Sequence, residues 1–135
     1  MPYLVGIALA LSISSMATLV GLDRDRAFYP TVVMVVAAYY VLFAVMGGSG
    51  HALVVEIVVM AGFVLAAVIG FKQSLWLVAA ALVGHGVFDF FHGRLVANAG
   101  VPAWWPAFCM TYDLVAAGYL AWRLTRDPAR RLRVA

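Results

Sequence analysis

The hydrophobic residues of this chain fall into five long runs, separated by short polar or glycine-containing joints. The runs cover approximately residues 2–22, 30–47, 52–71, 74–92 and 105–122. Each has about 18 to 21 residues, close to the roughly 20 that a helix needs to cross the hydrocarbon core of a bilayer. Most joints are short, so neighbouring helices should be antiparallel, and only residues 93–104 form a longer loop. The pattern predicts an all-α polytopic membrane protein, a single domain built as a bundle of five transmembrane helices.

The composition supports the membrane class. Of the 135 residues, 66% are hydrophobic and only 11% are charged, and a soluble domain of this size could not bury so much apolar surface. The single cysteine, Cys109, excludes an intrachain disulfide. We expect Cys109 to be a small packing residue inside a helix, with a ligand or nucleophile role as the alternative.

Charged residues at the joints predict how the bundle is oriented. Arg24, Arg26 and Lys72 fall on the same side as the C-terminal segment 123–135, which holds five further arginines, whereas the opposite side has only Arg94. The positive-inside rule then places the N-terminus outside and the C-terminus in the cytoplasm. We expect a multi-pass protein of the inner (plasma) membrane whose basic tail contacts anionic lipid headgroups. Membrane lipids are therefore the expected partners, and nucleic acid is not, because no folded basic module accompanies the tail.

Small residues recur at four-residue spacing, which lets helices approach closely. The pairs are Gly6 with Ala10, Ala66 with Gly70, and Ala80 with Gly84. Gly84 and Gly86 also flank His85, where they would allow another helix or a ligand to come near.

Three ionisable residues interrupt the fourth apolar run. His85, Asp89 and His92 are spaced i, i+4 and i+7, so they share one face of a helix. Ionisable side chains are costly inside a membrane and by default mark a functional site. This stripe is therefore the first candidate for chemistry.

The antiparallel topology brings other polar side chains to similar depths. At 1.5 Å of rise per residue, Glu56 and Asp89 lie roughly 5 to 6 Å inside the outer ends of their helices, and His85 and Asp113 lie roughly 10 to 12 Å inside. Two layers are predicted. The upper one contains Glu56, Asp89 and His92, with His51 nearby, and the lower one contains His85, Asp113 and a tyrosine. Tyr39 and Tyr40 are adjacent, so at most one of them can point into the polar layers. His51 itself is expected to be interfacial and not a ligand.

Histidine and carboxylate side chains are suitable ligands for a divalent zinc, iron or manganese ion. His85 and His92 are about 10 Å apart along the helix axis, too far to bind one ion. A single ion would take His85 with Asp89, or Asp89 with His92, and would recruit Glu56 or Asp113. We favour Asp89, His92 and Glu56 as the metal ligands. His85 and Asp113 would then be catalytic acid or base residues, or would support the ligands.

The leading functional hypothesis is a metal-dependent hydrolase that acts on a lipid or another apolar small-molecule substrate, with a metal-bound water as nucleophile. Three alternatives stay open. The same residues would form the proton relay or cation path of an oligomeric transporter or channel subunit. His85 or His92 would bind haem in a haem- or hydrophobic-ligand-binding protein. Finally, the polar side chains would form a hydrogen-bonded network that only fixes helix register.

Three segments, Asp23–Pro30, Gly84–Asp89 and Gly100–Pro106, resemble a family of short bacterial integral-membrane proteins of unknown function. That resemblance covers nearly the whole chain and implies a bacterial inner-membrane protein. The intramembrane histidines and aspartates are also loosely similar to the ceramidase and adiponectin-receptor group of zinc hydrolases. Those proteins have seven spans and a His-x-x-x-His pair, both of which this chain lacks, so the similarity concerns only the type of ligand.

Overall fold

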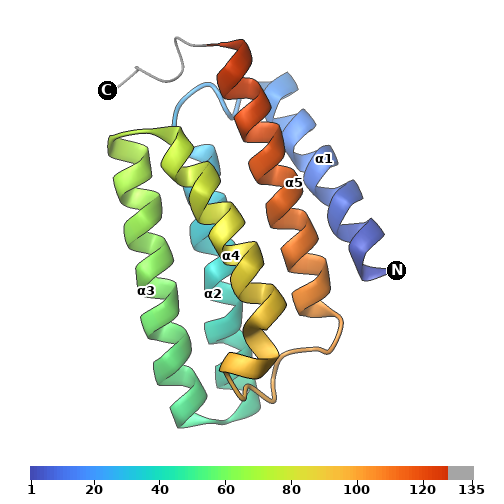
Figure 1. The fold of residues 1–135 in the computed structure, drawn as a ribbon, viewed down its shortest axis with the longest axis vertical. Helices are drawn as coiled ribbons and strands as arrows, with labels where there is room; N and C mark the ends of the chain where they lie inside the picture. Colours follow the sequence, from blue (N-terminus) through green and yellow to red (C-terminus); the bar gives the residue numbers. More distant parts are fainter. Residues whose placement is uncertain (128–135) are drawn as a thin grey trace.

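The computed structural model describes residues 1–127, and within them the chain is all-helical. Five helices follow one another: α1 (Pro2–Val20), α2 (Phe28–Gly47), α3 (Gly50–Lys72), α4 (Leu75–Leu95) and α5 (Trp105–Arg126). They run side by side along the long axis of the molecule (Figure 1). The five predicted runs thus become five helices, whose ends differ from the predicted ones by a few residues.

The helix ends agree with the local sequence. Ser49 and Ser74 precede α3 and α4, and each accepts a hydrogen bond from a backbone N–H of the first turn of its helix, as N-cap residues do. Gly21 and Gly48 follow α1 and α2 with φ of 90° and 69°, a left-handed conformation that glycine adopts without a steric penalty. These caps explain why the joints between helices are so short.

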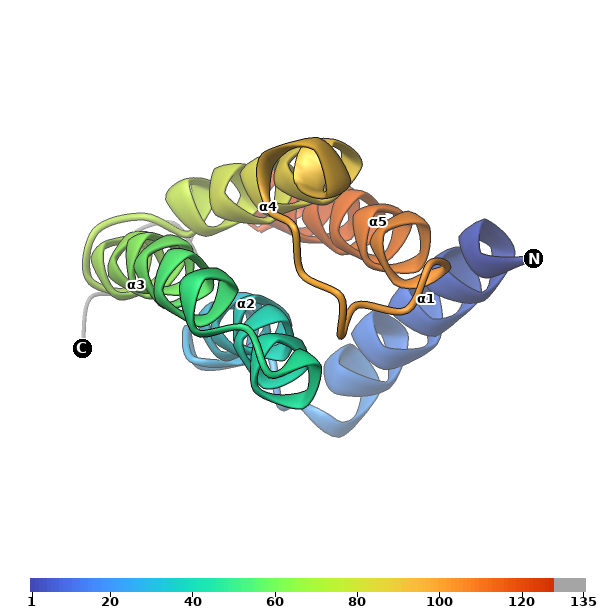
Figure 2. The same ribbon diagram turned by 90° about the horizontal axis from the view of Figure 1, so that it is seen from below.

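Helix α1 occupies the edge of the bundle. It packs mainly on α5, which in turn packs on α4, while α2 packs chiefly on α3 and less on α4. Seen along the helices, α2 and α3 lie opposite α4 and α5, and α1 extends beyond α5 (Figure 2). Polar side chains of α4 therefore face α2, α3 and α5 in the interior.

Four of the helices, α1 to α4, are long and apolar enough to cross a membrane. The fifth, α5, has 22 residues and so has the length, but Thr111, Asp113 and Arg123 make it more polar. Four of the five predicted spans thus have the length and composition expected of a membrane-crossing helix.

The distribution of side chains also fits a bilayer. Large apolar residues point outward, for example Leu19 (83% exposed), Val58 (66%) and Leu65 (60%). The buried polar and charged residues are Ser14, Asp23, Arg26, Glu56, His85, Asp89, His92 and Asp113. An apolar exterior, with polar side chains buried beside the hydrophobic core, is the arrangement expected where the surroundings are lipid and not water.

The basic residues gather at one end of the bundle. Arg123 pairs with Asp23 at 3.6 Å, and Arg26 donates to the carbonyl of Gly70 at 3.1 Å, so the 21–27 joint, the end of α3 and the end of α5 lie together. Because α5 continues to Arg126, the predicted tail from residue 123 begins as helix; most of that tail, residues 128–135, lies outside the described part.

Two of the three predicted small-residue pairs contain a glycine at a close helix contact. A Cβ on Gly6 would overlap α5, and one on Gly70 would lie 2.6 Å from a methyl of Val78. Gly84 is exposed, and a Cβ there would meet only Phe63, at 3.8 Å. Its neighbour Gly86 is buried and serves as the contact glycine of α4.

Candidate functional site

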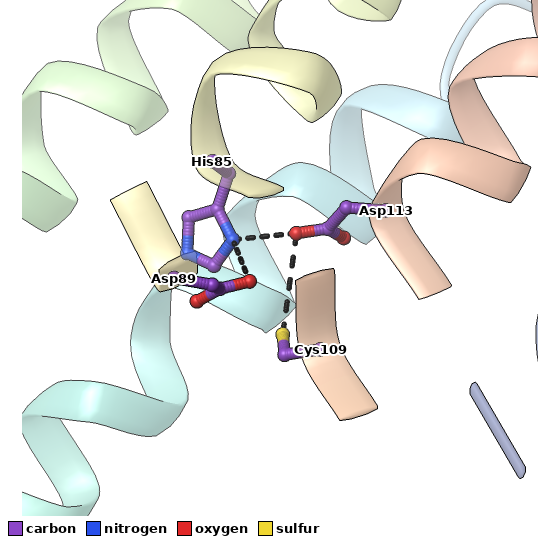
Figure 3. Close-up of side chains that lie close together, drawn as sticks. All are labelled: His85, Asp89, Cys109 and Asp113. Carbon is purple, nitrogen blue, oxygen red and sulfur yellow. Dashed lines mark hydrogen bonds and ion pairs between the residues drawn. The ribbon is translucent and has the colours of Figure 1, made fainter. Parts of the chain in front are cut away.

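His85 lies between two carboxylates in the interior. Its Nδ1 atom is 2.6 Å from Asp113 Oδ2 and 3.5 Å from Asp89 Oδ2. Figure 3 shows the imidazole reaching from α4 toward Asp113 on α5, with Asp89 one helical turn further along α4. The side chains of His85, Asp89 and Asp113 are all 1% exposed or less.

The close approach of α4 and α5 makes this contact possible. Gly86 directly follows His85, and a Cβ there would lie 3.3 Å from the carbonyl oxygen of Met110 and 3.5 Å from Asp113 Cβ. Without a side chain at Gly86, the two backbones come near enough for a short histidine–aspartate contact. The i, i+4 spacing then places Asp89 on the same face of α4.

Cys109 completes a group of four potential metal ligands. Its Sγ atom lies 4.0 Å from Asp113 Oδ2, and the ligand atoms of His85, Asp89, Cys109 and Asp113 all lie within 4.8 Å of one another. Ligands bound at ~2.1 Å around a tetrahedral ion are roughly 3.4 Å apart. Small side-chain shifts would therefore fit the group around one ion.

The charges in this group are unbalanced. Among the described residues, His85 supplies the ion pairs of both Asp89 and Asp113, so one imidazole faces two carboxylates. Three buried atoms of this group have no hydrogen-bond partner among the described residues: His85 Nε2, Asp89 Oδ2 and Asp113 Oδ1. A buried charge without compensation costs several kcal/mol. A divalent cation would supply the positive charge that the two carboxylates lack.

Tyr40 connects this group to a second polar pair. Its hydroxyl donates to Asp89 Oδ1 at 2.6 Å, and its ring stacks on the imidazole of His92 at 4.1 Å between centroids. Tyr39 turns away and contacts the ring of Trp105, which confirms that only one of the two tyrosines enters the polar interior.

The second pair joins α3 to α4. His92 Nε2 lies 2.7 Å from Glu56 Oε1. Asn98, in the loop after α4, donates to the same carboxylate oxygen at 3.0 Å and to the backbone carbonyl of Tyr40 at 3.1 Å. This loop amide thus holds α2 and α3 together at one end of the bundle.

The structure divides the predicted ligand set. Asp89 belongs with His85 and Asp113, whereas His92 and Glu56 pair with each other, so Asp89, His92 and Glu56 do not form one compact group. The prediction that placed Asp89 in the upper layer, with Glu56 and His92, was therefore wrong. The lower layer does come together as predicted, with His85, Asp113 and a tyrosine, which is Tyr40. Of the two metal sets that the sequence left open, geometry favours His85 with Asp89 and Asp113.

Two residues that take part in these contacts were not signalled by the sequence. Cys109 was expected to be a packing residue, Asn98 lies in the predicted loop 93–104, and nothing in their local pattern distinguishes them. His51, expected to be interfacial, is exposed at the start of α3.

An apolar groove adjoins the polar group. It has a volume of about 850 Å³ and is lined by side chains of α1, α2 and α5, including Tyr39, Trp105 and Tyr112. Cys109 also lines it, so this thiol lies between the groove and the carboxylates.

Comparison of the chain with protein-family models, with curated proteins and with solved structures finds no match in any of the three. The resemblance to short bacterial membrane proteins therefore stays a prediction, and the function has to be inferred from the side chains themselves.

Proposed function

We propose that this protein is a membrane-embedded metalloenzyme that binds one divalent ion through His85, Asp89 and Asp113 and acts on a lipid or another apolar substrate. The observation that carries the proposal is the buried group of ligand atoms within 4.8 Å of one another, contributed by α4 and α5. A nitrogen ligand with two carboxylates suits zinc, iron(II) or manganese. Three protein ligands leave one position for water or substrate, as in catalytic zinc sites.

The proposed topology has five transmembrane helices, with the N-terminus outside and the C-terminus in the cytoplasm of a bacterial inner membrane. Support comes from the basic residues Arg24, Arg26 and Lys72, which flank the joints at the end of the bundle where α5 also finishes. In this orientation the ion site lies in the outer half of the bilayer.

Cys109 lies beside the ion site and lines the groove. We assign the open coordination position to this side, because a substrate in the groove would approach the ion there. Tyr40 and the His92–Glu56 pair hold the carboxylate of Asp89 in place from the other side, the role that hydrogen-bonded neighbours of metal ligands commonly have.

Hydrolysis is the chemistry that such a site favours. An ion held by His85, Asp89 and Asp113 would lower the pKa of a water molecule and supply a hydroxide nucleophile for an ester carbonyl carbon. Addition to this carbon would break its bond to the alcohol oxygen, and the alcohol would leave with the proton given up by the water. The products are a carboxylic acid and an alcohol, and water is the only co-reactant.

Cobalt(II) binding tests the proposal, because the ion substitutes for zinc and gives visible absorption bands. Titration of detergent-purified, metal-free protein should produce bands near one equivalent. Asp113→Asn and His85→Gln should lose them, while Cys109→Ser should keep them.

Two results would count against the site as assigned. Absence of cobalt bands in folded wild-type protein would leave only an ion-free hydrogen-bonded network. A strong thiolate charge-transfer band that disappears in Cys109→Ser would show that the thiol fills the fourth position, contradicting an open catalytic site.

A further inference from the structure

The groove between α1, α2 and α5 is lined mainly by apolar side chains. It exists because α1 packs mainly on α5 and not on α2, so the space between α1 and α2 is left unfilled by helix packing. Figure 2 shows α1 diverging from α2, with α5 beside α1. The walls are apolar side chains such as Leu9, Ile13, Val32 and Val35.

The groove matches one leaflet of a bilayer in length. On α1 its lining runs from Pro2 to Ile13, which corresponds to about 17 Å of helix at 1.5 Å per residue. The hydrocarbon core is ~30 Å thick, so the chain of a lipid in one leaflet occupies roughly 15 Å. A single acyl chain would therefore run the length of the groove.

One end of the groove is walled by two tryptophans. Trp104 and Trp105 line the groove where α5 begins, and the Nε1 atom of Trp105 is buried without a hydrogen-bond partner among the described residues. Tryptophan at a membrane interface commonly directs its N–H toward a polar group. The ester carbonyl at the head of an acyl chain is an acceptor of the right kind for this place.

We infer that the groove binds one acyl chain of a glycerophospholipid from the outer leaflet, with the ester carbonyl at Trp105 and the chain along α1 and α2. This inference rests on the proposed function for its consequence, which is that the bound lipid is the substrate. Cys109 lies one helical turn after Trp105 and lines both the groove and the ion site. Trp105 lies eight residues before Asp113, about 12 Å away along α5, so the bound lipid has to move inward for its ester to reach the ion.

Photo-crosslinking tests the inference. The probe is a phosphatidylethanolamine with a diazirine near the end of one acyl chain, added to the protein in detergent micelles and mapped by mass spectrometry after irradiation. We expect labels on groove residues of α1 and α2, and we expect unlabelled phosphatidylethanolamine to compete with them. Labels spread evenly over all lipid-facing helices, without competition, would overturn the inference, and so would chain-to-chain products showing that a second copy fills the groove.

A matched pair of substitutions separates the groove from the general surface. Val35 lines the groove and is 49% exposed, whereas Val58 faces outward from α3 and is 66% exposed. Val35→Trp should reduce groove labelling at least tenfold, and Val58→Trp should leave it unchanged, with thermal unfolding confirming that both variants fold. Equal labelling in both variants would contradict the inference.

The ion site and the groove can fail separately. Asp113→Asn, which removes a proposed ligand, should keep the wild-type pattern of lipid labels. Groove labelling in folded wild-type protein that binds no cobalt would refute the metal proposal and leave the lipid site standing. Cobalt binding without groove labelling would refute the lipid site and leave the metal proposal standing.

Discussion

Replacing Asp113 by asparagine should separate the metal-binding role of this carboxylate from its structural role. Asparagine has nearly the same shape, so a neutral hydrogen bond can replace the 2.6 Å contact with His85. Hydrogen bonds between transmembrane helices average ~0.6 kcal/mol and reach ~1.7 kcal/mol. The substitution also removes one of two carboxylates that share a single imidazole. In the absence of metal, the free energy of unfolding should therefore change by less than about 2 kcal/mol.

The difference should appear when metal is added. An ion at 100 times its dissociation constant stabilises the wild-type protein by ~2.7 kcal/mol, which corresponds to a rise in melting temperature on the order of 10 °C for a domain of this size. Loss of one hydrogen-bonded neighbour of a ligand already weakens metal binding by roughly 10- to 100-fold, and loss of a ligand should cost at least as much. If binding is 100-fold weaker, the same concentration stabilises Asp113→Asn by only ~0.4 kcal/mol.

Thermal unfolding of metal-free protein in detergent, followed during zinc and manganese titrations, measures this difference. Asp25→Asn is the matched control, because Asp25 is exposed in the joint between α1 and α2 and should respond as wild type does. The reasoning fails if Asp113→Asn and wild type show the same metal-dependent shift, or if the folded wild-type protein shows none.

Three further substitutions test the packing around the site. Gly86→Val should push α4 away from α5, lower the free energy of unfolding by about 1–3 kcal/mol through overpacking, and abolish cobalt binding. Gly84→Val is the control and should have little effect, because a Cβ there meets only Phe63, at 3.8 Å. Similar cobalt titrations for the two variants would contradict the role of Gly86. Tyr40→Phe removes the hydroxyl that donates to the carboxylate of Asp89 and should weaken cobalt binding about 10- to 100-fold while the protein stays folded. Unchanged affinity would show that this hydrogen bond does not position Asp89. Gly6→Leu should lower the thermal midpoint because α5 occupies the space beside it, unlike Gly62→Leu, where a Cβ meets nothing within 4 Å; equal midpoints would refute close packing of α1 on α5.

Much of the fold could be predicted from the sequence because lipid imposes a simple rule. Uninterrupted apolar runs of about 20 residues have few stable structures other than a membrane-crossing helix, and the five runs correspond to the five helices. The more polar α5 departs from the rule because Asp113 and Thr111 lower its hydropathy while pointing inward or toward α1. Inward-facing polar residues do not contact lipid, so hydropathy alone underestimates such a helix.

The site was predictable in place but not in grouping. Rise per residue gives depth, and depth placed His85 beside Asp113 and Glu56 near His92. It does not give the rotation of one helix against the next, which decides that Asp89 turns toward His85 and Tyr40 while His92, three residues on, turns toward α3. A cysteine in an apolar helix carries no positional signal, so Cys109 could be assigned only after α5 was placed against α4.

The position of α1 at the edge, against α5, has a consequence for how the protein is made. Ribosomes extend a chain by ~5–20 residues per second, and the main partner of the first helix is the last one in the sequence. After α1 has been synthesised, roughly 5–20 s therefore pass before α5 is complete. During this interval the contact face of α1, with Gly6, Ala10, Ser14 and Ala17, remains open to lipid or to the insertion machinery. Both the groove and the packing of α1 thus form only at the end of biosynthesis, when the last helix is complete.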